Sequence, residues 1–310
     1  MYLWICGVAV PVVATVCFRA DIGPVKEVFG LACSCLGVLA LVEVLLLKSN
    51  PLLDAIWREA GGTNPIPEWS WSVYRATTTI GHPVSNGIVF STASLLAIGQ
   101  FGITRRRQWV ACAVCCSAGA IASGARGSIL AIATGLGFIL AVMVLGGRRY
   151  AGIRRRLLGA VLIGVTVFLA VTAVVLAGRL ASQEAAQSSM ARESRAAVAI
   201  TAVRGRPLLG AGPNTASVVV GAVLPGQGAF EDAWLELAVA SGVVGAAVVM
   251  AAIGVAVGRA ARLMRLGVAG ALVAFTVDAA TANILEGHPG TLVLLGLLLA
   301  AAADEVESRA

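Results

Sequence analysis

Long apolar runs recur along the whole chain and constrain its fold more than any other feature. A helix needs about 20 mostly apolar residues to cross the hydrocarbon core of a bilayer, and runs of about this length follow one another from the first residues to the last. Hydrophobic residues make up 58% of the 310 residues and charged residues 13%, whereas soluble domains are about 45–50% apolar and about 25% charged. These values exclude an ordinary soluble protein and predict a polytopic, all-α membrane protein.

The apolar runs predict about nine transmembrane helices in a single domain, 1–310. The stretch 110–145 must contain two of them, because one helix of that length would measure about 54 Å against a hydrocarbon core of about 30 Å. Its polar break is 123–127, where two glycines suit a tight turn and Arg126 would otherwise lie in lipid. We place the nine helices near residues 2–18, 29–47, 84–103, 108–122, 127–146, 157–177, 233–257, 267–284 and 290–303.

Basic residues fall mainly between the apolar runs and predict the orientation of the chain. The sequence has 23 Lys and Arg and a net charge of +7, and positive residues favour the cytoplasmic loops of membrane proteins. A majority of them lie on one side when loops are counted alternately from the cluster 105–107. This predicts an external N-terminus, a cytoplasmic C-terminus and two long external segments near 48–83 and 178–232. The charge therefore predicts contact with the lipid bilayer and no nucleic-acid partner.

The cysteines give no sign of metal or redox chemistry. All seven lie inside apolar runs and lack the paired Cys and His spacing of a zinc or redox site. Free cysteine in such surroundings commonly acts as a small apolar packing residue. We therefore expect neither a metal site nor a bound cofactor.

Polar residues that topology does not require collect on the predicted external side. In the first external segment Arg75 and His82 follow an aromatic stretch, and Arg126 lies in the predicted turn. An alternative for both arginines is snorkelling, in which the side chain reaches the interface or a lipid phosphate. Pro83 then opens a helix whose first N–H groups can bind an anion.

The second external segment contains five arginines and no lysine, namely Arg179, Arg192, Arg195, Arg204 and Arg206. Planar guanidinium groups bind phosphate in a bidentate manner, so this composition favours phosphate recognition over diffuse charge. Arg192 and Arg195 share one face of a predicted helix, and Arg206 begins a Gly/Pro-rich turn. The alternative is a peripheral amphipathic helix with its basic face in solvent and residues 196–203 in the membrane interface.

Carboxylates gather where the span 233–257 begins. Glu231 and Asp232 precede it, and Glu236 lies one turn inside it. The helix dipole alone favours acids at a helix start, which is the structural alternative for the first two. Glu236 is deeper, where a carboxylate needs a partner or a water-filled cavity. Weaker members of the same external set are Asp278, Glu286 and His288.

Four segments, in this order, resemble motifs of the O-antigen ligase and O-antigen polymerase family of bacterial envelope glycosyltransferases. Segment 74–83 is similar to the family's Arg-x-x-Gly-Thr-Phe-x-x-Pro-Asn pattern, and 122–127 is similar to its Ser-Arg-Gly turn. Arg195 with 206–213 resembles the large-loop arginine and the Pro-Leu-Leu-Gly-x-Gly motif. Segment 231–245 is similar to its His-Asn-x-Tyr-Leu-x-Leu motif and later Gly-x-x-Gly. The resemblance implies a transmembrane helical bundle whose large external loop carries short helices and active-site elements.

The resemblance also implies a transfer reaction at the external face of the bacterial inner membrane. In this family a glycan carried on undecaprenyl pyrophosphate passes to an acceptor hydroxyl of a glycan or lipid without a metal. Arg75, Arg126 and Arg195 match the family's arginines, which implies that they bind the donor pyrophosphate. Fixed cations suit this role because the negative charge of the leaving group grows in the transition state.

Glu231 lies where ligases of this family carry a histidine that activates the acceptor, which implies a catalytic role for it. A carboxylate with a pKa of about 4.3 is a weaker base than histidine unless burial raises its pKa. The substitution therefore favours a polymerase or an exopolysaccharide member over a strict ligase. Possible secondary site residues are His82, Arg192, Arg206, Asp232 and Glu236.

Two other classes of function stay open from the sequence. One is a transporter or flippase of an anionic lipid-linked precursor, in which the arginines only guide phosphate. Such proteins commonly show inverted repeats and polar residues near the midplane, whereas here the polar residues lie at one face. The other is a non-catalytic assembly protein with the same fold. The presence of Glu231 in place of the family's histidine is the feature that suggests this class.

Overall fold

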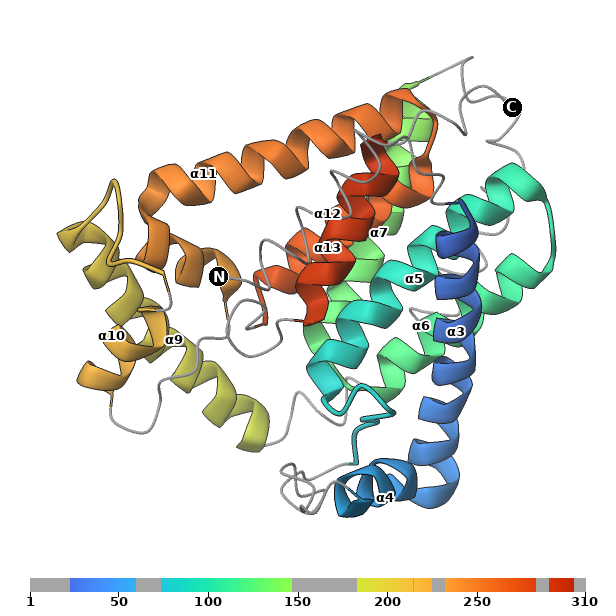
Figure 1. The fold of residues 1–310 in the computed structure, drawn as a ribbon, viewed down its shortest axis with the longest axis horizontal. Helices are drawn as coiled ribbons and strands as arrows, with labels where there is room; N and C mark the ends of the chain where they lie inside the picture. Colours follow the sequence, from blue (N-terminus) through green and yellow to red (C-terminus); the bar gives the residue numbers. More distant parts are fainter. Residues whose placement is uncertain are drawn as a thin grey trace.

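All regular structure in the described part of the chain is helical. The computed structural model describes residues 23–59, 74–146, 183–213, 215–224, 232–282 and 290–303. These residues form helices and no strands (Figure 1), which confirms the all-α class. The elements are α3 (Gly23–Val42), the π-helix η2 (Glu43–Leu47), α4 (Pro51–Glu59), α5 (Pro83–Thr104), α6 (Gln108–Ala122), α7 (Arg126–Leu145), α9 (Gln183–Gly205), α10 (Ala216–Val223), α11 (Ala233–Arg262), α12 (Leu266–Ala279) and α13 (Gly290–Ala303).

Each predicted membrane run that falls within the described residues forms a helix. The runs 2–18 and 157–177 lie outside those residues. Four helices are long and apolar enough to cross a membrane, namely Pro24–Leu47, Pro83–Thr104, Arg126–Leu145 and Ala233–Arg262, whereas α6, α12 and α13 are apolar but shorter. The chain is therefore a helical membrane protein, but the predicted count of nine spans is not confirmed.

The stretch 110–145 folds back on itself, as the sequence predicted. α6 ends at Ala122 and α7 begins at Arg126. Between them Gly124 has a φ of +62°, a left-handed conformation that glycine adopts without a steric clash at Cβ. The turn therefore places Arg126 at one end of the bundle.

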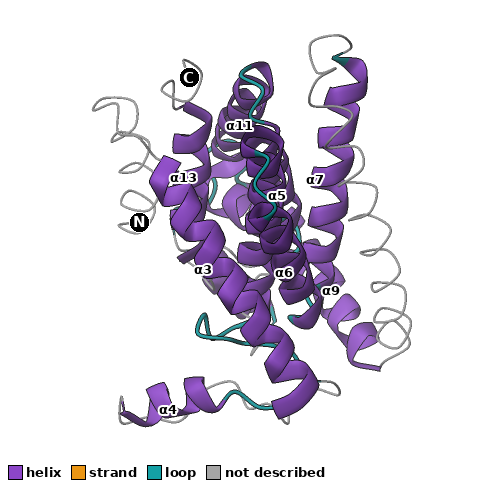
Figure 2. Cartoon of the chain, turned by 90° about the vertical axis from the view of Figure 1, so that its right-hand side faces the viewer, coloured by secondary structure: helices purple, strands orange, loops and turns teal. Residues whose placement is uncertain are grey.

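Small residues let the helices of the bundle approach closely around α5, which contacts α3, α6, α7 and α12. Figure 2 shows α3 and α7 on opposite sides of α5 and α6. A Cβ on Gly99 of α5 would lie 2.5 Å from Gly267 Cα of α12, and one on Gly135 of α7 would lie 2.8 Å from Gly270 O of α12. Contact through small residues is typical of helices in lipid, where burial of apolar side chains gives little driving force.

The alternation of the helices produces two ends with different chemistry. The first, which we call the basic end, contains Lys26, Arg105, Arg106, Arg107, Arg259, Arg262 and Arg265. There Arg265 Nη1 donates to Ala301 O at 2.7 Å, which ties the start of α12 to the end of α13. The second, which we call the motif end, contains residues 43–50, 74–86, 122–128, 232–236 and 276–282.

α9, α10 and the first part of α11 pack beside the bundle, on the left of Figure 1. Ala199, Ala216, Val220 and Val239 are buried at the centre of this cluster. Residues of the apolar side of α9, including Ala199, therefore pack against protein. This contact gives α9 a role in the fold that differs from the interfacial alternative.

Candidate functional site

The segment 74–82, which contains the first motif, is held by a buried carboxylate from another helix. Glu43, at the start of η2, is 1% exposed. Its Oε2 accepts hydrogen bonds from Thr77 N at 3.0 Å, from Thr78 N at 3.2 Å and from the Tyr74 hydroxyl at 3.2 Å. One side chain therefore fixes the segment at three points.

Two buried asparagines complete the support of this segment. Asn50 Nδ2 donates to Thr77 Oγ1 at 2.6 Å and to Thr78 O at 2.8 Å. Asn86 Nδ2 donates to Ala76 O at 3.0 Å, and its Oδ1 accepts from the Thr78 hydroxyl at 2.8 Å. Thr78 has a φ of +43°, an uncommon conformation for a β-branched residue that the surrounding hydrogen bonds maintain.

His82 ends the segment as the N-cap of α5. Its Nδ1 accepts a hydrogen bond from Val84 N at 3.2 Å, and Pro83 takes the first helical position. Both features favour a helix start at this residue. The predicted secondary site residue therefore has a structural task at the motif end.

The first two motifs meet at the turn between α6 and α7. Arg75 Nε donates to Ser123 O at 3.0 Å, and Ala76 N donates to Ala122 O at 3.1 Å. Arg126 begins α7 three residues after Ser123 and is half-buried. Its guanidinium has no hydrogen bond or ion pair with any described residue. This corner therefore brings two predicted phosphate-binding arginines to one turn, where Arg126 has no partner among the described residues.

A buried carboxylate joins the first turn of α7, which begins at Arg126, to two other helices. Asp278 of α12 accepts from the Ser91 hydroxyl of α5 at 2.6 Å and from the Ser128 hydroxyl of α7 at 2.7 Å. Gly127 packs so closely on Thr281 that a Cβ there would overlap the threonine hydroxyl. Asp278, a weak member of the predicted set, therefore joins three helices where α7 begins.

The first turn of α11 brings the carboxylate motif to the same end of the bundle. Asp232 is the N-cap and accepts from Trp234 N at 2.9 Å and Leu235 N at 3.1 Å. Burial raises the pKa of Asp232, and these two hydrogen bonds oppose the shift. Trp234 Nε1 donates to Thr276 O of α12 at 3.0 Å. Glu231, the predicted base, immediately precedes this turn and lies outside the described residues.

Arg195 and Glu236 approach the contact between α9 and α11 from the two helices. Ala199 of α9 and Val239 of α11 are buried in the same cluster. Arg195 lies one helical turn before Ala199, and Glu236 lies one turn before Val239. Arg195 is half-buried, Glu236 is 1% exposed and Arg192 is exposed. The two arginines that share a face in the sequence prediction therefore differ in environment.

A kink in α11 creates the contact with the third motif. Gly242 has φ +72° and ψ 176°, outside the helical region. The Val243 N–H, which would ordinarily donate to Val239 O, donates instead to the first carbonyl of the segment 207–212 at 2.8 Å. Two N–H groups of that segment donate to the carbonyls of Val239 and Ala240, at 2.7 and 2.9 Å. The crossing segment thus replaces hydrogen bonds that the kink removes.

Glycine is required on both sides of this crossing. A Cβ on Gly210, whose φ is +67°, would lie 2.5 Å from Gly242 N, and one on Gly242 would overlap Leu208 O. The Pro-Leu-Leu-Gly-x-Gly motif and the later Gly-x-x-Gly motif therefore fit against each other. Arg206, just before the crossing, is exposed.

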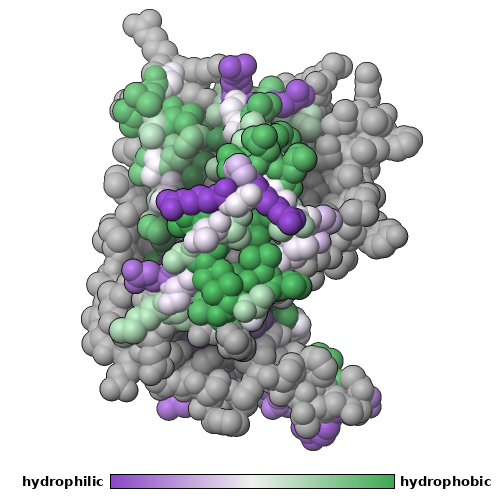
Figure 3. All heavy atoms as spheres, turned by 90° about the vertical axis from the view of Figure 1, so that its left-hand side faces the viewer, coloured by the Kyte–Doolittle hydropathy of each residue, from purple (hydrophilic) through white to green (hydrophobic). Residues whose placement is uncertain are grey.

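Figure 3 shows the side of the molecule that carries α9 and α10, where hydrophilic side chains form a band between hydrophobic areas. Exposed residues of these elements and their connection include Arg192, Arg204, Arg206, Leu208 and Leu209. The basic residues of this segment are thus largely open to solvent or lipid headgroups, in contrast to the half-buried Arg75 and Arg126.

The end of α12 connects the pieces at the motif end. Thr276 accepts from the first turn of α11, and Thr281 packs against Gly127 beside Arg126. The main described contacts of α9, which carries Arg195, are with α10 and α11. The structure therefore joins the Arg75 and Arg126 motifs directly, and the convergence of Arg195 with them stays a prediction.

Several residues that shape the motif end were not among the predicted site residues. They are Glu43, Asn50, Asn86, Ser91 and Ser128. Glu43 did carry a signal, because it is the one charged residue of the apolar run 29–47, and an ionisable residue in such a run commonly has a task.

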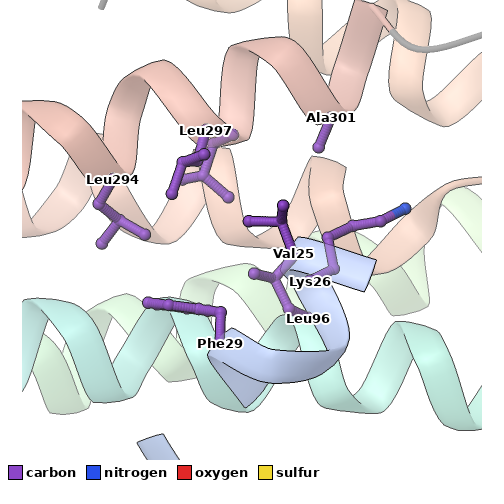
Figure 4. A pocket seen from close by; sticks show the side chains of 8 residues that line it. Val25, Lys26, Phe29, Leu96, Leu294, Leu297 and Ala301 are labelled. Atoms are coloured by element: carbon purple, nitrogen blue, oxygen red, sulfur yellow. The ribbon is translucent and has the colours of Figure 1, made fainter. Parts of the chain in front are cut away.

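A small pocket lies at the basic end, away from these motifs. It is lined by residues of α3, α5 and α13 that include Val25, Phe29 and Leu297, with Lys26 as its charged lining residue (Figure 4). None of the predicted site residues lines it. Among the described residues, no three His, Cys, Asp or Glu side chains gather as metal ligands.

Fold and sequence together define a helical membrane protein with polar motifs collected at one end. Residues 111–250 match the family model described as O-antigen ligase. This match supports the resemblance to the O-antigen ligase family that the motifs predicted, and it indicates a glycan-transferring membrane enzyme of polysaccharide assembly. The matched range includes the turn with Arg126, α9 and the kinked part of α11, and the Arg75 segment precedes it. No curated protein matches the chain.

Proposed function

We propose that this chain is a membrane glycosyltransferase of the polymerase or ligase type. It transfers a glycan from an undecaprenyl-pyrophosphate-type donor to an acceptor hydroxyl of a second glycan or a lipid. The observation that carries the proposal is the corner where Arg75 donates to Ser123 O while Arg126, on the same turn, has no partner among the described residues. The turn with Ser123 and Arg126 lies within residues 111–250, which match the O-antigen ligase family model.

The arginines bind the donor pyrophosphate in this proposal. A guanidinium group presents a planar set of donors that suits phosphate oxygens. Arg126 lies at the motif end of the bundle and is half-buried, and Arg195 of the loop 178–232 supplies a further cation. The cations stabilise the charge that develops on the leaving group, so that the reaction proceeds without a metal or cofactor.

Glu231 acts as the general base. It removes the proton from the acceptor hydroxyl while that oxygen attacks the anomeric carbon of the donor sugar, and the bond from this carbon to the pyrophosphate oxygen breaks. A single displacement inverts the configuration at the anomeric carbon. The cap formed by Asp232 supports this assignment, because it fixes the chain immediately after Glu231.

The reaction takes place on the external face of the inner membrane. The basic end carries the clusters that favour the cytoplasm, and the motif end lies at the other end of the helices. Cysteine labelling near Arg126 and near residue 105 tests this orientation, in a background without native cysteines. Labelling of both positions from the same side contradicts it.

Mass spectrometry of lipid-linked glycans tests the function. Cells that lack the protein should accumulate the undecaprenyl-linked donor on the external leaflet, and the parent gene or an Arg192→Ala variant should restore the normal pool. Arg126→Ala should not restore it. Accumulation on the cytoplasmic leaflet would instead support a flippase, and an unchanged pool would support a non-catalytic assembly protein.

A further inference from the structure

We infer that Glu43 is a positioning residue for Arg75, and that it thereby contributes to donor binding without touching the donor. The inference rests on the proposed function and deepens it. Glu43 belongs to a π-helical turn at the end of α3. Such turns are rare in proteins overall, and those that occur are often found at functional sites. No motif of the sequence analysis includes Glu43.

The hydrogen bonds of Glu43 lie on both sides of Arg75 in the sequence. The Tyr74 hydroxyl precedes Arg75, and the N–H groups of Thr77 and Thr78 follow it, and all three donate to one carboxylate oxygen. A buried donor that loses its acceptor is left unsatisfied, so these three hydrogen bonds hold the segment firmly. The carboxylate therefore fixes the backbone from which the Arg75 side chain extends.

The position of Arg75 is set against a second element as well. With the segment held by Glu43, Ala76 N reaches Ala122 O at 3.1 Å and Arg75 Nε reaches Ser123 O at 3.0 Å. Because the guanidinium group is planar, a hydrogen bond from Nε restricts the orientation of the whole group. A preorganised cation stabilises developing charge without reorganisation during the reaction, so loss of Glu43 should weaken donor binding through Arg75.

The backbone of Glu43 also helps to place its carboxylate beside the segment 74–78. Its carbonyl accepts from Lys48 N, which has a φ of +51° and ends the π-helix. The helix therefore terminates directly beyond the carboxylate, and the chain turns toward Asn50, which binds the same threonines. The Glu43 side chain and the chain that follows the helix end therefore hold the same segment, at Thr77 and Thr78.

Binding of undecaprenyl pyrophosphate to the purified full-length chain in detergent tests the inference. We compare Glu43→Ala and Glu43→Gln in the parent and in an Arg75→Ala background, with Glu27→Ala as the matched control, since Glu27 is an exposed acid of the same helix. The Ala variant should bind about tenfold more weakly, which corresponds to the loss of about 1.4 kcal/mol. The Gln variant keeps an acceptor oxygen and should lose less, and the control should bind as the parent does.

The double variants separate positioning from a general loss of stability. If Glu43 acts through Arg75, removing it in the Arg75→Ala background should have little further effect, because the two changes are not additive. Equal weakening in both backgrounds, or unchanged binding of Glu43→Ala in the parent, overturns the inference. If the Ala variant does not fold, the same comparison with the Gln variant decides.

Hydrogen exchange provides a readout that does not depend on the donor. The amides of Thr77 and Thr78 should exchange faster in Glu43→Ala, whereas amides of α7 should not change. If the parent does not bind undecaprenyl pyrophosphate, the proposed donor is wrong, and the exchange data still decide whether Glu43 orders the segment. Unchanged exchange at both threonines overturns that role.

Discussion

Two regions of the molecule hold their motifs in place by different means. At the corner of Arg75 and Arg126, buried side chains such as Glu43 and Asp278 bind neighbouring elements through side-chain hydrogen bonds. At the crossing of 207–212 with α11, the contacts are almost entirely between backbones, and glycine makes them possible. The first region depends on side-chain chemistry and the second on the absence of side chains.

The difference indicates how each region responds to change. A hydrogen-bonded side chain can be replaced by an isostere that keeps part of its function, whereas a glycine at a backbone crossing has no such substitute. The corner is therefore suited to fix a charged group in one orientation. The crossing is suited to fix the direction of α11 and, through it, the position of the residues at its start.

The largest effect is expected at Glu231, just before the first turn of α11. Glu231→Gln keeps the shape but removes the base, so the transfer rate should fall by about 10²–10⁴-fold while donor binding survives. Asp232→Asn is the matched control, because asparagine also caps helices well. Rates are measured with purified protein, donor and acceptor. A Gln variant that transfers at the parent rate assigns the base to another residue, and Asp232, Glu236 or His82 is then tested.

The crossing itself should be the next most sensitive feature. Gly210→Ala adds a left-handed strain of about 1–2 kcal/mol and overpacking of about 1–3 kcal/mol, because its Cβ would press on Gly242 N. Gly254→Ala, in the same α11 but with open space around its Cβ, should be neutral or slightly stabilising. Thermal unfolding in detergent compares the two. Equal stability of both variants contradicts the requirement for glycine at the crossing.

A smaller effect is expected when the arginines are replaced. These variants test whether the two regions bind one ligand. Arg126→Ala and Arg195→Ala should each weaken binding of undecaprenyl pyrophosphate by about 10–100-fold, while Arg192→Ala, an exposed residue on the same helix as Arg195, should have little effect. If both bind one diphosphate, the double variant should lose less than the product of the single losses. Independent, multiplicative losses place Arg195 outside a shared site.

The contrast also explains which parts of the structure could be predicted from the sequence. The helices and the turn at Gly124 follow from apolar length and from a polar break, both local properties. The arrangement of the corner does not follow from local properties, because Glu43 and Asp278 acquire their partners only when segments distant in sequence pack together. The meeting of Gly210 with Gly242 was likewise hidden, since each glycine alone reads as an ordinary turn or helix residue.

The smallest effect is expected at Asp278, where side-chain hydrogen bonds join α5, α7 and α12. Asp278→Ala removes the acceptor of two serine hydroxyls, but Ser91 keeps a hydrogen bond to Ile88 O at 3.0 Å. Hydrogen bonds between membrane helices contribute about 0.6 kcal/mol on average, so the loss of stability should be about 1 kcal/mol. Asp278→Asn, which keeps one acceptor and adds a donor, should lose less.

Thr276→Val of the same helix is the control for Asp278, because among the described residues the Thr276 hydroxyl bonds within α12 alone, to Leu272 O. Thermal unfolding in detergent ranks the variants. If Asp278→Ala and Thr276→Val unfold at the same temperature, the junction of the three helices does not depend on the carboxylate. In that case Arg126 owes its position to the close packing of Gly127 on Thr281, and the corner resembles the glycine crossing more than it differs from it.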